Sequence, residues 1–283
     1  MATHQQQHYV PRFLLDQWHT PPDNKLTSFR WAHGKLTHKR FVAKSVAKLE
    51  HLYSMQRESA QPDVKVERDF LGPCVDEPAS LSHKAIVQSG VRLLKDQQKI
   101  DWARFLVSLL LRVPAMMEDM RARGRKVLAA GLDEAPNEYL EARGDAPEST
   151  LREWVEKNHP SVLDDLAVMT LPHLVQSQLL NNAFLSATWA TRQLKKSRFD
   201  LLIADKPLIY VGTFETSFLV GLPIAPKLAF FAFNNKETWT NLVRQSDKSI
   251  TRGVNLSSVS QAERYVYGTS PQQDSFVAKY LRK

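Results

Sequence analysis

The sequence predicts an α+β fold, with long central helices packed against an N-terminal β-hairpin and a C-terminal mixed or antiparallel β region. Three observations lead to this prediction. Two β-favouring segments flank a glycine turn near the N-terminus, a long middle segment is apolar almost all round, and the last third consists of short β-branched or aromatic runs separated by Gly and Pro. We expect one α+β domain over 1–283, with a motif and hairpin at 8–55, a helical middle at 79–195 and a β-rich part at 198–283.

The hairpin is the first regular element after the opening stretch HYVPRFLLDQW. TPPDNK at 20–25 predicts a turn, because proline restricts φ and Asp and Asn favour turn conformations. KLTSFRW and KLTHKRFV follow as two strands joined at Ala32, His33 and Gly34, where glycine adopts a positive φ at little steric cost.

The middle of the chain predicts helices. The first covers 79–92, and the clearest runs from about 96 to 126. The first half of this long helix is apolar almost all round, which indicates a central, buried position. Pro114 lacks a backbone donor and clashes with the preceding turn, so we expect a kink near 110–114.

Residues 131–150 indicate a surface excursion with a short helix, and a second long helix is expected at roughly 161–195. Asn235 is a suitable N-cap because its side chain can accept a hydrogen bond from a free helical amide. The elements expected in the last third are strands within RFDLLIADKPLIYVG, SFLVGLPIAP and KLAFFAF, helices at 236–245 and 254–263, a strand at RYVYG and a closing helix at 271–281.

Composition and charge limit the partners and the cellular compartment that we expect for this protein. The formal net charge is +8, which favours nucleic acid or another anionic ligand as a partner, although scattered basic residues also suit an ordinary solvated surface. No apolar stretch approaches the roughly 20 residues that cross a bilayer, so no membrane partner is expected. MATHQQQHYV lacks the basic start and apolar segment of a secretory signal, and the single Cys74 fits a reducing compartment; we therefore expect a cytoplasmic protein.

Common catalytic and cofactor motifs are missing from the sequence. It contains no GxxxxGK[ST], GxGxxG, HExxH or GxSxG pattern, so no cofactor is assigned. His4 and His8 have the i, i+4 spacing of metal ligands only if they are helical, and Pro11 argues against a helix there. We assign no metal site, and oligomeric state is left open.

Polar residues interrupt the apolar part of the long middle helix. Arg104, Ser108 and Arg112 follow the spacing i, i+4, i+8 and share one side of the helix. A buried guanidinium keeps its charge and needs a partner. The two arginines therefore pair with acids elsewhere or reach solvent, or at least one of them lines a cleft and binds an anion.

The second long helix repeats this spacing with His173, Ser177 and Asn181, and Gln176 lies beside them. These side chains could face the arginines across a polar seam. The alternative is that they form the solvent side of the helix.

Two further sets combine groups suited to acid–base chemistry. His8, Tyr9 and Arg12 bring together an imidazole, a phenol and a guanidinium, which can transfer protons and stabilise anions. Asp205 and Lys206 follow an apolar strand where it opens into a turn, a common place for site residues. The alternative for Asp205 is a turn aspartate that accepts from backbone amides.

With these residues located, the chain resembles a widespread, mainly bacterial family catalogued as domain of unknown function 4238. HYVPRFLL resembles the family's N-terminal His-Tyr-Val-Pro signature, and FLVSLLLRVP is similar to its helix ending in Arg-Thr-Pro. Arg112 and Pro114 match that ending, whereas Val113 replaces threonine.

Later segments extend the resemblance. LLIADKP is similar to the family's Ser-Asp-Asn-Pro turn: Asp205 and Pro207 match, while Ala204 and Lys206 depart from it. GLPIAP and NLSSVSQAERYVYG also match, so the resemblance spans about 8–268. It implies that His8, Arg12, Arg112 and Asp205 come together or support the same architecture, and it implies no reaction.

Two classes of function follow. The first is a nuclease-like hydrolase acting on nucleic acid or another phosphate-bearing substrate, and the second is a non-enzymatic binding module for an anionic small molecule or a partner protein. In the hydrolase, His8 is the general acid or base, Arg12 and Arg112 stabilise negative charge, and Asp205 orients His8 or holds a metal. The residues assigned to substrate binding are Tyr9, Arg104, Asn181 and Lys206. A third interpretation is that the polar residues form a buried structural network.

Overall fold

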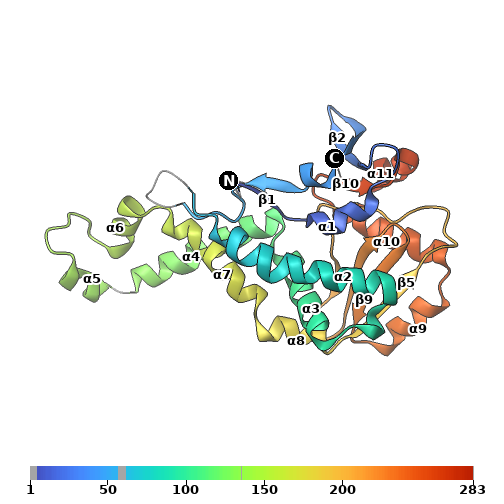
Figure 1. Ribbon diagram of the computed structural model, residues 1–283. Coiled ribbons are helices and arrows are strands. Elements are labelled where there is room, and N and C mark those ends of the chain that lie inside the picture. The colour runs from blue at the N-terminus through green and yellow to red at the C-terminus, as the bar shows by residue number, and fades with distance from the viewer. Residues whose placement is uncertain (1–4, 57–61, 135, 283) are drawn as a thin grey trace.

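The computed structural model describes residues 5–56, 62–134 and 136–282, and it confirms the α+β class (Figure 1). Within these residues the strands form antiparallel sheets with the orders β1-β4, β3-β2-β10-β6 and β5-β9-β8-β7. Their bounds are β1 (Gln6–His8), β2 (Leu26–Ala32), β3 (Lys35–Phe41), β4 (Lys48–Glu50), β5 (Thr188–Gln193), β6 (Ile203–Ala204), β7 (Ile209–Gly212), β8 (Phe218–Ala225), β9 (Leu228–Phe233) and β10 (Val266–Gly268).

Helices fill the centre and both ends of the chain. The α-helices are α1 (Arg12–Leu15), α2 (Glu77–Ser89), α3 (Asp96–Leu111), α4 (Pro114–Asp133), α5 (Pro136–Ala142), α6 (Leu151–Asn158), α7 (Val162–Val175), α8 (Gln178–Leu185), α9 (Lys236–Arg244), α10 (Asp247–Gln261) and α11 (Asp274–Tyr280). The short 3-10 segments are η1 (Asp16–Trp18), η2 (Ala43–Ser45), η4 (Val91–Leu93) and η5 (Pro271–Gln273), and η3 (Val66–Asp76) is a π-helix. None of the described helices is long and apolar enough to cross a membrane.

The N-terminal hairpin is confirmed. β2 and β3 pair from Leu26↔Phe41 to Ala32↔Lys35, which leaves His33 and Gly34 as the turn. Both turn residues have positive φ, 49° and 75°, as a two-residue hairpin turn requires to match the twist of its strands.

The prediction of one long helix at 96–126 is wrong, because the segment forms two helices. α3 ends at Leu111 and α4 begins at Pro114, which occupies the first helical turn, where a missing amide costs nothing. Val113 is extended, with ψ 147°, since a residue before proline avoids the helical region. The proline therefore breaks the segment completely and leaves Arg112 at the C-cap of α3.

The prediction of a second long helix at 161–195 is also wrong. The chain forms α7 and α8 and then β5, which pairs with β9 from Thr188↔Phe233 to Gln193↔Leu228. The helical middle thus ends near residue 185, because pairing with a distant strand overrides the local helical pattern. In the last third, Asn235 caps α9 as expected, whereas the helix expected at 254–263 begins earlier, at Asp247.

The two larger sheets are packed differently. Sheet β5-β9-β8-β7 lies beside α2 and α3 in Figure 1, and Trp102 of α3 packs edge-on against Phe230 of β9. Sheet β3-β2-β10-β6 packs one face against α10 and α11 through a cluster that includes Phe29, Val266 and Val259. Because side chains alternate along a strand, Ser28 and Arg30 of β2 and Thr37 and Lys39 of β3 occupy the other face of this sheet.

Candidate functional site

His8 lies at the end of β1, directly opposite Lys48 of β4. Its ring hydrogen-bonds to the backbone of Lys44 and lies within electrostatic range of Lys48, Arg112 and Arg12. Burial lowers the His8 pKa, and the three cations lower it further because they disfavour the imidazolium. Nε2 is buried and has no hydrogen-bond partner among the described residues, so His8 presents a neutral ring with a free nitrogen. His4, weighed above as a second metal ligand, lies outside the described residues.

Arg112 is fully buried and organises a cluster of polar groups, which we call the Arg112 centre: His8, Tyr53, Glu67, Asp76 and Arg112. Nη1 of Arg112 donates to Oδ1 of Asp76 at 2.8 Å, and the Arg112 carbonyl accepts from the Tyr53 hydroxyl at 2.5 Å. Nε and Nη2 of Arg112 have no hydrogen-bond partner among the described residues. Burial raises the Glu67 pKa to about 7; the Asp76 charge adds to this and Arg112 opposes it.

The π-helix η3 explains how Glu67 and Asp76 both face Arg112. They are nine positions apart. Nine residues make about two and a half turns of an α-helix, which would place the side chains on opposite faces. The wider turn of a π-helix, with i→i+5 bonds, returns them to one face after about two turns. Sequence reasoning did not identify either acid, because their spacing would place them on opposite faces of an α-helix.

The Asp205 carboxylate accepts hydrogen bonds from the backbone just before β10. Its Oδ1 accepts from the Glu263 amide at 2.9 Å, and its Oδ2 accepts from the amides of Arg264 and Tyr265 at 2.7 and 2.8 Å. Asp205 therefore accepts from backbone amides, as the alternative expected, but these three amides lie 58 to 60 positions later in the chain and not in its own turn. Asp205 also raises the pKa of Tyr9 by its charge, second to burial, and Tyr9 is hydrogen-bonded to Tyr267.

The other predicted residues contact different parts of the chain. Arg12 is 63 % exposed and lies 3.5 Å from Asp16. Arg104 donates to the Cys74 carbonyl and lies 3.5 Å from Asp101. The structure thus brings His8 near Arg112 and Arg12, but it does not place Arg104 among the groups around His8.

Asn181 and Lys206 make local backbone contacts. The Asn181 amide donates to the carbonyls of Val175 and Ser177, which joins the end of α7 to the start of α8. The Lys206 side chain is exposed, and its carbonyl accepts from Gln261. The predicted polar seam does not form, because α7 ends at Val175 and His173 is exposed.

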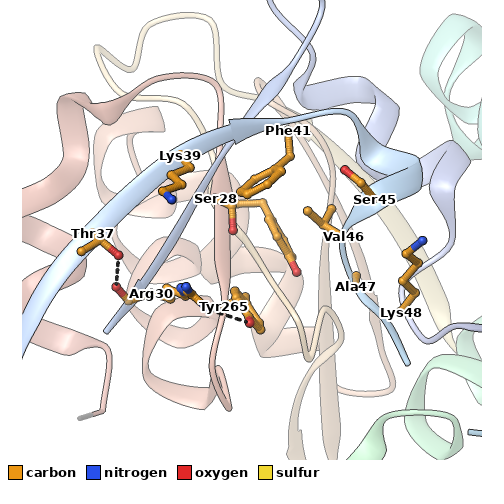
Figure 2. Close-up of a pocket in the computed structure, with 11 residues that line it drawn as sticks. Ser28, Arg30, Thr37, Lys39, Phe41, Ser45, Val46, Ala47, Lys48 and Tyr265 are labelled. Carbon is orange, nitrogen blue, oxygen red and sulfur yellow. Dashed lines mark hydrogen bonds between the residues drawn. The ribbon is translucent and has the colours of Figure 1, made fainter. Parts of the chain in front are cut away.

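A cavity of about 230 Å³ lies on the open face of sheet β3-β2-β10-β6 (Figure 2), and we call it the sheet-face pocket. Its walls are β2, β3, the segment before and at the start of β4, and β10, through Ser28, Arg30, Thr37, Lys39, Phe41, Ser45, Val46, Ala47, Lys48, Tyr265 and Tyr267. Arg30, Lys39 and Lys48 have no ion-pair partner within the described residues, and Arg30 donates to the Tyr265 hydroxyl at 3.5 Å. The pocket therefore combines unneutralised positive charge with aromatic rings.

The alternation of polar residues in KLTSFRW and KLTHKRFV could have revealed this pocket. Ser28 and Arg30 share one face of β2, while Phe29 and Trp31 share the other, which packs into the core. Sequence reasoning used these strands only to define the hairpin, because which face another segment covers depends on the tertiary fold.

The pocket adjoins the opening motif at two points. Lys48 lines the pocket and is the cross-strand neighbour of His8, so the two side chains lie on the same face of the β1-β4 ribbon. Tyr267 lines the pocket and is hydrogen-bonded to Tyr9. His8, a member of the Arg112 centre, and its neighbour Tyr9 therefore link that centre to the sheet-face pocket.

Comparison with known proteins identifies the family. No curated protein and no solved structure matches the chain. The model of the family described as "Protein of unknown function (DUF4238)" matches residues 6–272, which include β1 with His8, the Arg112 centre, Asp205 and every wall of the sheet-face pocket. Since this match covers nearly the whole chain, the protein belongs to the DUF4238 family.

Proposed function

We propose that the protein binds single-stranded nucleic acid at the sheet-face pocket. The observation that supports this is the set of three cations without counter-ions beside aromatic rings on an open antiparallel sheet, within the described residues. Phosphates are neutralised by Lys and Arg, and unstacked bases pack on exposed aromatic rings. In this proposal Arg30, Lys39 and Lys48 contact the phosphates, and a base packs against Tyr265 and Phe41.

We favour nucleic-acid binding over the hydrolase predicted from the sequence, in which His8, Arg12, Arg112 and Asp205 are the catalytic residues. Both oxygens of Asp205 accept hydrogen bonds from backbone amides, and Arg112 is enclosed and paired with Asp76. These contacts engage the Asp205 carboxylate with backbone amides, which argues against its use to orient His8. The net charge of +8 adds long-range attraction to a polyanion in either case.

The proposal predicts a salt-dependent interaction. A labelled single-stranded oligonucleotide titrated with the protein should bind, and the triple variant Arg30→Ala/Lys39→Ala/Lys48→Ala should bind at least about tenfold more weakly. The slope of log K against log salt should fall by about 2, since each phosphate contact on a single strand contributes about 0.7. Fluorescence anisotropy at several salt concentrations measures both quantities.

The matched control also replaces one arginine and two lysines, but at positions outside the pocket. Lys126, Lys236 and Arg244 are exposed on α4 and α9 and line no part of the pocket. If Lys126→Ala/Lys236→Ala/Arg244→Ala weakens binding as much as the pocket variant, the interaction is diffuse and the proposed site is wrong. Failure of the unmodified protein to bind would reject the function itself.

A second candidate is hydrolysis of the bound strand. Glu67 has a pKa of about 7 and can transfer protons near neutral pH, and His8 Nε2, which has no hydrogen-bond partner among the described residues, can accept a proton. End-labelled RNA and DNA incubated with and without divalent metal should then be cleaved, and His8→Gln should slow cleavage at least about tenfold while anisotropy reports unchanged binding. Tight binding without any product would leave binding as the function.

A further inference from the structure

A second and larger groove lies at the C-terminal end of the chain and shares no lining residue with the sheet-face pocket. It is formed by the 196–199 turn, α10, η5 and α11, and its volume is about 680 Å³. Sites for small molecules typically span about 300–1,000 Å³, so this groove accommodates a ligand of nucleotide size. We call it the C-terminal groove.

Five cations line the C-terminal groove: Lys196, Arg198, Lys248, Arg252 and Lys279. No Asp or Glu is among its lining residues in the described part of the chain. The acids nearby are engaged elsewhere: Asp200 lies 2.9 Å from Lys227, and Asp247 lies 3.4 Å from Arg192. The groove therefore keeps an unneutralised positive potential that attracts an anion of several charges.

The rest of the lining combines uncharged polar side chains with three aromatic residues, Phe199, Phe276 and Tyr280. Phe199 is 42 % exposed, and the Arg198 guanidinium lies 5.5 Å from its ring centre. Phe276 and Tyr280 pack together across 4.9 Å, and the Lys279 ammonium lies 5.3 Å from the Tyr280 ring. Positive charge is thus placed directly beside aromatic faces, an arrangement that suits a ligand with both a flat ring and an anionic tail.

A rigid hydrogen-bond network supports the groove. Asn255 is 2 % exposed; its Oδ1 accepts from the Leu202 amide at 2.8 Å, and its Nδ2 donates to the Asp200 carbonyl at 2.9 Å and to Gln273 at 3.0 Å. These bonds tie α10 to η5 and to the chain before β6. The groove is preformed, which reduces the ordering cost of binding.

We propose that the C-terminal groove binds a nucleoside polyphosphate. The base packs against Phe199 and the Phe276-Tyr280 pair, and the phosphates contact Lys248 and Arg252 on α10. The bounded volume and the aromatic lining favour this ligand over an extended polyanion, which would need charge along a continuous surface. This proposal stands independently of nucleic-acid binding at the sheet-face pocket.

Isothermal titration calorimetry with ATP, adenosine and inorganic tripolyphosphate tests the proposal, since the three probes separate the ring from the phosphates. We expect ATP to bind more tightly than either fragment. Lys248→Ala/Arg252→Ala should weaken ATP binding at least about tenfold through lost phosphate contacts. Phe199→Ala should weaken ATP but leave tripolyphosphate unchanged, because only the ring contact is lost.

Two controls keep the outcome interpretable. Lys126→Ala/Arg244→Ala removes equal charge from α4 and α9, outside the groove, and should bind ATP normally, as should the triple variant of the sheet-face pocket. All substituted side chains in the C-terminal groove variants are exposed, and circular dichroism verifies their folding. Absence of ATP binding, equal affinity for ATP and tripolyphosphate, or binding only to vesicles of anionic lipid would overturn the proposal.

Discussion

Replacing Asp76 with alanine should lower the free energy of unfolding by about 3–5 kcal/mol, the range observed when one partner of a buried ion pair is removed. The Arg112 side chain is 0 % exposed, and its hydrogen bond to Asp76 is 2.8 Å long. Without Asp76 the guanidinium keeps its charge, because arginine does not deprotonate in proteins, and it loses the carboxylate to which it donates among the described residues. Urea denaturation followed by circular dichroism measures the loss.

Two comparisons show whether burial causes this effect. Arg104 pairs with Asp101 at 3.5 Å and is 28 % exposed, against 0 % for Arg112, so water can reach the guanidinium left by Asp101→Ala and the cost should be less than about 1 kcal/mol. The double variant Asp76→Ala/Arg112→Met removes both charges and should recover much of the stability lost in Asp76→Ala, since apolar replacement of a buried pair is often neutral. A cost for Asp76→Ala no larger than that of Asp101→Ala would contradict the buried pair.

Replacing Glu67 with glutamine should change how stability depends on pH. Burial raises the Glu67 pKa from 4.5 to about 7, so the folded protein keeps the Glu67 proton over a range in which the unfolded chain has lost it. The stability from protonated Glu67 is fully present below pH 4.5 and is lost as the pH rises through about 7. At about 1.4 kcal/mol per pKa unit, the loss amounts to about 3 kcal/mol.

Glutamine cannot ionise, so Glu67→Gln should gain up to about 3 kcal/mol relative to the natural chain between about pH 4 and pH 8. His8 acts in the opposite direction: burial lowers its pKa below 6.5, so its contribution is present above that pH and is lost on acidification. Because both proteins contain His8, its effect largely cancels in the difference. Urea denaturation at several pH values gives this difference, and a constant value would show that folding does not shift the Glu67 pKa.

Local sequence signals predicted much of the fold. The β2-β3 hairpin followed from two alternating segments around a glycine turn, and the cap of α9 followed from Asn235. The burial of α3 followed from an apolar pattern nearly all round. The signals for these features come from residues close together in the sequence, so the features can be predicted without the tertiary structure.

The site was harder to predict. His8 was identified by its grouping with Tyr9 and Arg12, and Arg112 because an arginine in an apolar helix needs a partner. The structure places His8 and Arg112 within electrostatic range of each other. Glu67 and Asp76 were missed, because side chains nine residues apart lie on opposite faces of an α-helix but on the same face of the π-helix that forms here. The assignment of catalytic roles to His8, Arg12, Arg112 and Asp205 stays a prediction.

The sequence by itself determined the α+β class, the family, the hairpin and the need of buried Arg112 for a partner. Only the tertiary structure decided that residues 188–193 form a strand, that Asp76 is the partner of Arg112, and that Asp205 accepts from the backbone at the start of β10. It also decided that three cations of separate strands share one pocket. The physical reason is that strand pairing and charge compensation are made between groups far apart in the chain, and their free energy depends on what burial brings together.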